Sequence, residues 1–243
     1  MHWPFLKESY IYGGDHYFFS SALVRGNEIT LIEDGISNYS ITHYRIKYKK
    51  LKRFLFGDLA AANNFGISHN VKKIILTGIS NIPIEIQDKT QVIDLRSIWN
   101  SLALRDKNYI LDLFDMPFKK LHILKMYDSI LFTQPLYEDG ILSIEEELQL
   151  YHKLLAECDT SKLVIKTHPR DKKDYSKIFP KAFIFKSIIP MELVSFCGIK
   201  FSEVYTIFST AALQLPYQTN IHFLGTKVHT KLLDRFGPIQ YSI

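Results

Sequence analysis

A histidine flanked by basic residues follows one short apolar segment of the chain. Residues 163–166 (LVIK) have the pattern of a buried strand, and His168, Pro169 and Arg170 come shortly after it. Proline restricts the residue before it to an extended conformation, so His168 stands on a stiff connection. Its imidazole can donate a hydrogen bond or a proton to an anion, and Lys166 and Arg170 add positive charge. A histidine that only caps a loop would fit the same spacing, so both interpretations stay open.

Acidic residues follow another strand-like segment. Glu33 and Asp34 come directly after residues 28–32 (EITLI), and a carboxylate at this position can take a proton from an acceptor hydroxyl. Side chains alternate along a strand, so only one of the two acids is expected to face a cleft squarely. A plain Asp-Gly turn is the alternative interpretation. Asp139, in a second Glu-Asp-Gly triplet at 138–140, offers the same group and is a reserve candidate for the base.

Two predicted helix starts carry groups suited to a nucleotide. Ser209 and Thr210 follow the strand-like segment 203–208, and hydroxyls with backbone N–H groups at a helix N-terminus can hold an anion. Glu192 lies two residues after Pro190, which favours the first turn of a helix, and its carboxylate can accept hydrogen bonds from ribose hydroxyls. Simple capping and helix-dipole stabilisation explain the same residues without a ligand, so these alternatives remain.

The elements that must position these residues alternate between strand and helix patterns. Strands are expected at 10–12, 28–32, 71–76, 91–95, 129–133, 163–166, 183–185, 203–208 and 221–224. Helices are expected at 16–24, 59–64, 97–113, 143–156, 190–196, from 209 onward and at 230–236. Such alternation is typical of βαβ units with a parallel sheet covered on both faces. Ligands of such sheets bind at the carboxyl ends of the strands, which is where the candidate residues fall.

The composition is that of a globular chain with a mildly basic surface. Hydrophobic residues make up 47% and charged residues 23% of the 243 positions, which is enough for a packed core. The net charge of +5 favours anionic partners such as nucleotides, acidic sugars, phospholipid head groups or nucleic acid. Two cysteines without a Cys/His cluster predict neither a disulfide framework nor zinc, and no DxD metal site is found.

A basic segment interleaved with aromatic residues lies between the first two groups of strands. Such a run most often forms a solvated face, and contact with an anionic membrane surface and nucleic acid binding are the alternatives. No run of about 18 apolar residues and no signal peptide is found, which predicts a cytoplasmic protein, peripheral at the inner face of the membrane. The basic residues of this segment are Lys47, Lys49, Lys50, Lys52 and Arg53.

Four segments, taken in order, resemble the bacterial GT-B sialyltransferases, above all the lipooligosaccharide sialyltransferases of glycosyltransferase family 52. Residues 29–35 (ITLIEDG) are similar to the acidic motif of that family, and residues 164–170 (VIKTHPR) to its His-Pro motif. Residues 189–194 (IPMELV) look like the segment that contacts the ribose, and residues 205–213 (YTIFSTAAL) like the Ser/Thr segment that binds the phosphate. The resemblance covers residues 10–225 and is thin between residues 40 and 125.

The resemblance implies a role for each matching residue. The general base would be Glu33 or Asp34, and Asp139 is kept in reserve because an acid nearer the His-Pro motif has been considered in some members. His168 would contact the CMP phosphate and assist its departure. The family is metal-independent and needs no cofactor beyond the donor CMP-sialic acid. The residues expected to bind that donor are Lys166 and Pro169 at the cytidine, Glu192 at the ribose, Ser209 and Thr210 at the phosphate, and the flanking Arg170.

The same resemblance implies two Rossmann-like parallel-sheet domains in a GT-B-like α/β fold. Residues 119–243 are expected to form the domain that binds the CMP-sugar, and residues 1–118 a partial domain on the acceptor side. The family has several strands before its acidic motif, whereas here the motif begins at residue 33. A shortened N-terminal domain is therefore expected, completed by a second copy in a homodimer or left incomplete by truncation.

The activity implied is an inverting glycosyl transfer. A carboxylate takes the proton from a hydroxyl of a glycan acceptor, that oxygen attacks the anomeric carbon of sialic acid, and CMP leaves. The acceptor is expected to be a cell-surface glycan, lipooligosaccharide or capsule, and no nucleic acid partner is expected. Transfer of another CMP-linked sugar such as Kdo is one alternative, and a truncated, inactive remnant that still binds CMP is another.

Overall fold

The fold consists of two compact units, Met1–Ile98 and Trp99–Ile243, and each is described by itself. A computed structural model describes residues 10–15, 27–34, 36–39, 54, 66–215 and 219–240. The division falls at residue 98, not at the expected residue 118. The reason lies in two helices, α3 (Leu95–Ser101) and α4 (Leu104–Leu113), whose Trp99 and Leu111 are buried in a core of the second unit. Predicted helices at 16–24 and 59–64 lie outside the described residues, as does the basic segment.

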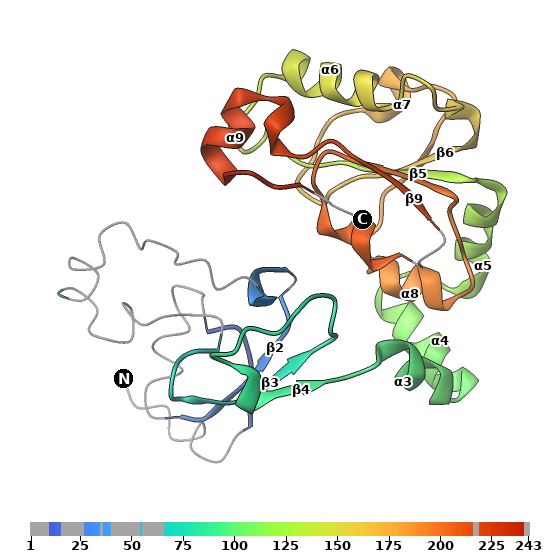
Figure 1. The fold of residues 1–243 in the computed structure, drawn as a ribbon. Coiled ribbons are helices and arrows are strands. Elements are labelled where there is room, and N and C mark those ends of the chain that lie inside the picture. The colour runs from blue at the N-terminus through green and yellow to red at the C-terminus, as the bar shows by residue number, and fades with distance from the viewer. Residues whose placement is uncertain are drawn as a thin grey trace. The chain divides into compact units, whose positions relative to one another are not determined.

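The first unit is built on a four-stranded parallel sheet in the order β1-β2-β3-β4 (Figure 1). Its core holds Leu31, Val71, Ile74, Leu76 and Ile86, all almost fully shielded from solvent. Because β2 and β3 pair in parallel, their carboxyl ends lie next to each other, with Ile32 paired to Ile75. The elements of this sheet are β1 (Ile11–Gly13), β2 (Ile29–Ile32), β3 (Val71–Leu76) and β4 (Thr90–Val92), with the 3-10 helices η2 (Ile36–Tyr39) and η4 (Gln87–Lys89).

The second unit contains a five-stranded parallel sheet in the order β7-β6-β5-β8-β9. The chain starts at the centre with β5, fills one half of the sheet, and then crosses to the other half with β8. The point between β5 and β8, where the strand order reverses, is where doubly wound sheets bind ligands. The strands are β5 (Ser129–Phe132), β6 (Leu163–Lys166), β7 (Phe183–Phe185), β8 (Glu203–Thr206) and β9 (Asn220–Phe223).

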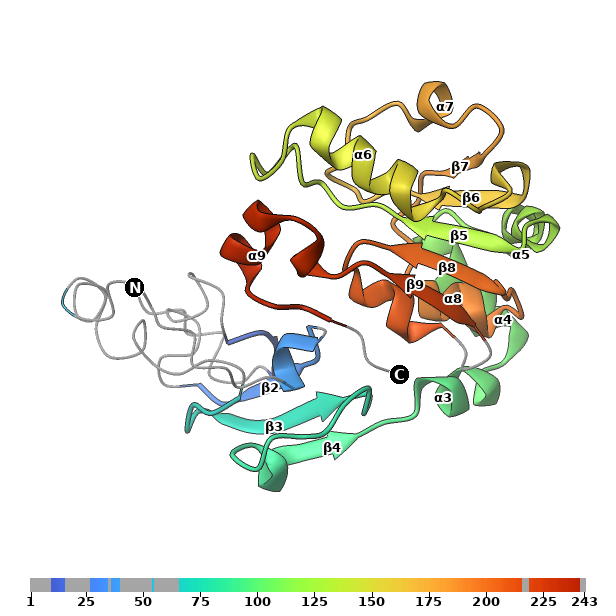
Figure 2. The ribbon, with the colours of Figure 1, turned by 45° about the horizontal axis from the view of Figure 1, so that its top comes forward.

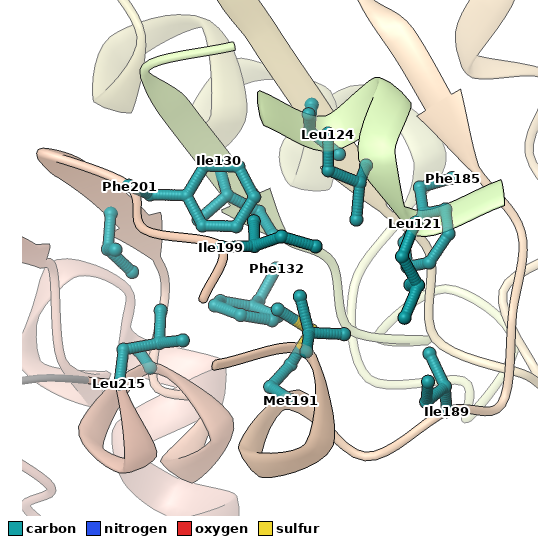
Figure 3. Packing of buried hydrophobic residues seen from close by; sticks show 14 of the residues in the cluster. Leu121, Leu124, Ile130, Phe132, Phe185, Ile189, Met191, Ile199, Phe201 and Leu215 are labelled. Carbon is teal, nitrogen blue, oxygen red and sulfur yellow. The ribbon is translucent and has the colours of Figure 1, made fainter. Parts of the chain in front are cut away.

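Helices cover both faces of this sheet, which explains why its inner strands read as continuous apolar runs (Figure 2). On one face α6, α7 and α9 pack against residues such as Leu131 and Ile165. On the other face α8 and α5 pack against Ile130 and Phe132, and Figure 3 shows these two side chains of β5 among those of Met191, Leu121 and their neighbours. The helices are α5 (Phe118–Leu121), α6 (Ile144–Leu154), α7 (Tyr175–Ile178), α8 (Met191–Phe196) and α9 (Thr230–Phe236), with short 3-10 turns η5 (His122–Met126), η6 (Thr160–Lys162) and η8 (Thr226–Val228).

The helix α6 begins as its sequence predicts. The hydroxyl of Ser143 accepts the N–H of Glu146 at 3.2 Å, and the Glu146 carboxylate accepts the N–H of Ser143 at 2.8 Å. This reciprocal capping box satisfies two backbone donors at the helix start, and Glu145 and Glu147 add negative charge where the helix dipole favours it. The cap fixes where α6 starts and therefore how its buried residues meet the sheet.

The fold class expected from the sequence, α/β with two Rossmann-like parallel-sheet domains, is confirmed. Two local expectations are wrong. The single helix expected over 97–113 is two helices, because Ala103 is extended between them with ψ of 154°. The helix expected from Ser209 is the 3-10 helix η7 (Thr210–Gln214). Within the described residues, no helix is long and apolar enough to cross a membrane.

Candidate functional site

A cavity opens at the carboxyl ends of β5, β6 and β8, beside the first turn of α8. Its volume of about 290 Å³ is close to the lower end of the range typical of small-molecule sites. It lies at the reversal of strand order, and several residues predicted to bind the donor meet there. The lining residues are Phe132, Thr133, Lys166, Thr167, His168, Pro169, Ile189, Pro190, Met191, Glu192, Ser209 and Ala211.

His168 is held from two sides. Its backbone N–H donates to the hydroxyl of Thr133 at 3.1 Å, and its ring Nδ1 accepts the backbone N–H of Arg170, also at 3.1 Å. Because Nδ1 is an acceptor in this bond, the proton of the neutral ring belongs on Nε2. The ring therefore offers an Nε2–H donor with a fixed orientation.

The surroundings of His168 favour its neutral form. Burial and the positive charge of Arg170 hold the pKa of this imidazole below its ordinary value of 6.5, against the opposing effect of the nearby acids. At neutral pH the ring is thus a hydrogen-bond donor. An incoming anion would raise this pKa again, because a negative charge close to the ring favours the imidazolium form.

Lys166 places a buried ammonium group at the cavity. The residue is 9% exposed, its Nζ donates to the carbonyl oxygen of Ser187, and it lies 5.8 Å from the centre of the Phe185 ring. Burial lowers the pKa of this lysine. Across the described part of the chain, no carboxylate forms an ion pair with it. Because an unpaired buried charge is costly, this group favours an anionic or strongly polar ligand in the cavity.

Glu192 and Ser209 reach the cavity from the opposite side. Glu192 stands in the first turn of α8, directly after Pro190 and Met191. Ser209 precedes η7, and its backbone N–H donates to the hydroxyl of Thr206 at 2.8 Å. The Ser209 side chain does not cap that turn, so its hydroxyl is available to the cavity it lines. Of Thr210 only the backbone is described, as the first residue of η7.

Arg170 and Asp139 contact each other and do not line the cavity. The Arg170 guanidinium donates to the Asp139 carboxylate, which joins the loop after β6 to the loop after β5. The predicted donor contact of Arg170 would therefore compete with this ion pair. The reserve role of Asp139 as a base would compete with it as well.

A second, buried ion cluster joins the same two loops. Lys173 lies 2.9 Å from Glu138, 3.0 Å from Glu147 and 3.1 Å from Asp171, and its side chain is 6% exposed. The Glu147 side chain is fully buried, and its Oε1 has no hydrogen-bond partner in the described chain. Burial raises the pKa of Glu147, whereas Lys173 keeps a raised pKa because the bonds to Glu138 and Glu147 outweigh its own burial. This cluster fixes the loop that carries His168.

The two acids of the first unit differ in their contacts. The Glu33 carboxylate accepts the backbone N–H of Thr77 at 2.6 Å, the Thr77 hydroxyl at 2.8 Å and the Tyr39 hydroxyl at 2.6 Å. Burial, and then the Glu33 carboxylate, raise the pKa of Tyr39, so the phenol keeps its proton. Asp34 is exposed, and its backbone N–H donates to the side chain of Asn38 at 2.6 Å. Glu33 thus joins the ends of β2 and β3, while Asp34 faces solvent.

Some of the lining residues were not among the sequence candidates. Thr133 is the last residue of the strand expected at 129–133, and Thr167 stands inside the His-Pro motif, directly after the strand expected at 163–166. The position of both residues at the end of a strand was therefore a signal in the sequence. Ile189 and Met191 stand inside the segment 189–194 that resembles the ribose-contacting motif, but nothing in their apolar type singled them out, because such residues are usual in any core.

Comparison with known proteins assigns the chain to a family. A model of glycosyltransferase family 52 matches residues 7–232. The chain belongs to glycosyltransferase family 52. A protein of Haemophilus influenzae (strain ATCC 51907 / DSM 11121 / KW20 / Rd) described as uncharacterized is similar to this family 52 chain, with 40% identity over 237 residues, 98% of this chain and 75% of the relative. The family expected from the four motifs is confirmed, and membership implies glycosyltransferase activity.

Proposed function

We propose that this family 52 chain transfers sialic acid from CMP-sialic acid to a hydroxyl of a cell-surface glycan, with inversion at the anomeric carbon and without a metal. The observation that carries the proposal is the cavity at the reversal of strand order. There a buried, carboxylate-free Lys166 and the oriented Nε2–H of His168 converge with the carboxylate of Glu192. Cations, hydrogen-bond donors and one acid are the groups that a nucleoside monophosphate requires.

The donor would bind with its phosphate near His168 and Ser209 and its ribose at Glu192. A carboxylate in the first turn of a short helix can accept both ribose hydroxyls, as acidic residues do in nucleotide folds. Lys166 and Pro169 would contact the cytidine. As the bond to sialic acid breaks, negative charge grows on the phosphate, and the neutral His168 would meet it with a hydrogen bond already aimed at the cavity.

The exposure of Asp34 favours it as the general base among the three candidate acids. Glu33 accepts bonds from Thr77 and Tyr39, which would make it a positioning residue for the acidic loop. Asp139 is engaged by Arg170. Asp34 is exposed, as a group that takes a proton from a bulky acceptor must be. The proposed acceptor is a cell-surface glycan, either a lipooligosaccharide or a capsule.

Contact with a membrane through the basic segment is a prediction, because that segment lies outside the described residues. A homodimer is a prediction as well. Flotation with anionic vesicles would test the membrane contact, and light scattering the homodimer. An unchanged distribution upon replacing Lys49 and Lys50 by glutamine would count against the membrane contact.

Calorimetric titration of CMP into the purified protein tests the donor site, with UMP and GMP as controls. The expected result is binding of CMP in preference to both controls. The variant Lys166→Met should weaken CMP binding, because it removes the buried cation while keeping the length of the side chain. A folded protein that binds none of the three nucleotides, or all of them equally, would contradict the proposed donor.

A further inference from the structure

Two buried threonines line the cavity side by side and have no part in the roles given above. Thr133 follows β5 and Thr167 follows β6, and the backbone N–H of Thr133 donates to the carbonyl of Lys166 at 3.2 Å, which continues the pairing of the two strands. Thr133 is 3% and Thr167 is 7% exposed. Polar groups of residues buried to this degree normally have hydrogen-bond partners within the protein, in ordered water or in bound molecules.

The hydrogen bonds of the two hydroxyl groups are incomplete. Thr133 Oγ1 accepts the backbone N–H of His168 at 3.1 Å, but its own proton is donated to no acceptor in the described part of the chain. The Thr167 hydroxyl forms no hydrogen bond at all with the residues that the structure describes. Both residues reach the cavity, so an acceptor atom inside it would complete their bonding.

The position of Thr133 indicates which part of a nucleotide it would meet. Its strand is next to β8, and the two strand ends are tied together because the backbone N–H of Phe208 donates to the side-chain oxygen of Gln134 at 3.0 Å. In doubly wound sheets ligands bind in the crevice at this reversal of strand order. Among the lining residues the single acid is Glu192, on α8, so the strand ends offer donors and positive charge to an anion.

We infer that the hydroxyl groups of Thr133 and Thr167 donate hydrogen bonds to the phosphate of the nucleotide. This assignment rests on the proposed function, in which the cavity holds CMP. Thr133 then has two tasks: its oxygen fixes the backbone of His168, and its proton binds the phosphate that His168 also faces. The phosphate would be held by strand-end hydroxyls as well as by the turn at Ser209.

Calorimetric binding of CMP and of cytidine, which lacks the phosphate, separates this role from a general loss of structure. Thr133→Val, which keeps the shape and removes the hydroxyl, should weaken CMP binding about ten- to a hundredfold and leave cytidine binding within about twofold. Thr133→Ser should restore CMP binding. Thr167→Val should behave like Thr133→Val. Melting temperatures of all variants confirm that each is folded.

The matched control is Thr226→Val. Thr226 is also fully buried, but its hydroxyl donates to the carbonyl of Gly237 at 2.6 Å and accepts the N–H of Ile239 at 2.7 Å, away from the cavity. This variant should lower the melting temperature and leave CMP binding unchanged. Two results with a wild-type protein that binds CMP would refute the phosphate contact: Thr133→Val binds CMP as tightly as the wild type, or Thr133→Val loses affinity for CMP and for cytidine to the same extent. The proposed function would survive either result. If wild-type protein itself fails to bind CMP, the proposed function falls.

Discussion

Thr77 donates both its backbone N–H and its hydroxyl to the carboxylate of Glu33, at 2.6 and 2.8 Å. The pair connects the end of β2 to the residue that follows β3. Hydrogen bonds to an ionised group are stronger than those between neutral groups, so the contact holds the acidic loop in place. Glu33 therefore has a structural role at this edge of the sheet, and the adjacent Asp34 is exposed.

Substitution of these two acids should affect different properties. Glu33→Gln should lower the free energy of unfolding by about 1 to 3 kcal/mol, because charge-assisted bonds from Thr77 are weakened. Asp34→Asn should lower kcat about a hundredfold or more, as expected for a general base. Urea unfolding and initial transfer rates measure the two effects, with the exposed Asp112→Asn as control. Equal, mild losses of kcat in both variants would move the search for the base to Asp139.

The ionisation of His168 should respond to the nucleotide. Its pKa lies below 6.5 in the unliganded protein because of burial and Arg170, so the ring is neutral at pH 7. CMP should raise this pKa, because the phosphate favours the protonated ring. NMR titration of the ring signals with and without CMP measures the shift, with the exposed His152 as an internal reference. A pKa that stays constant or falls on addition of CMP would place the phosphate elsewhere.

Removal of the His168 side chain should slow the reaction without unfolding the protein. His168→Ala should reduce kcat by a factor on the order of 10² to 10³, the usual cost of one donor to a developing oxyanion. Its folding should be retained because the His168 backbone, which bonds to Thr133, is unchanged. Transfer rates and a melting temperature compared with His152→Ala test this. Wild-type turnover in His168→Ala would remove the histidine from the reaction.

Substitutions in the buried cluster around Lys173 should differ in how much they lower the free energy of unfolding. Lys173→Met leaves three carboxylates, two of them fully buried, without their cation and should cost about 3 to 5 kcal/mol of unfolding free energy. Glu147→Gln should cost much less, because burial already raises the pKa of that carboxyl and one of its oxygens has no partner. Urea unfolding at pH 7 compares them. A larger loss in Glu147→Gln than in Lys173→Met would contradict this account.

A chelator should leave transfer intact. The proposed site meets the phosphate with the Nε2–H of His168 and with hydroxyl groups, and these hydrogen-bond donors take the place of a divalent cation. Initial rates measured in EDTA, and again after excess Mg²⁺, provide the test. Activity that disappears in EDTA and returns with Mg²⁺ would count against a metal-independent reaction.

Regular elements were predicted well where short-range patterns decide them. The strands 71–76, 163–166 and 183–185 and the helix 230–236 have the expected bounds, because apolar runs and capping residues act within a few positions of each other. The break between α3 and α4 was missed, since Ala103 adopts an extended conformation without a proline or glycine to signal it. Local patterns also could not show that Trp99 packs into the core of the second unit.

The candidate site was predicted in outline only. Position at the end of a strand selected Lys166, His168 and Ser209, and position near a helix start selected Glu192. All four residues line one cavity. Position alone could not show that Arg170 is paired with Asp139, because that contact joins residues 31 positions apart. The bond between Thr133 and the His168 backbone spans 35 positions, so Thr133 was overlooked for the same reason.

The Lys173 cluster has a consequence for how this family can vary. Its four residues come from three separate segments. Loss of the lysine alone in one lineage would therefore leave the carboxylates of all three segments without their cation. Loss of Lys173 in related sequences is therefore expected to occur together with neutral residues at positions 138, 147 and 171, whereas position 147 can become neutral while the lysine is kept. Such concerted replacement would reveal the cluster in an alignment even where no structure exists.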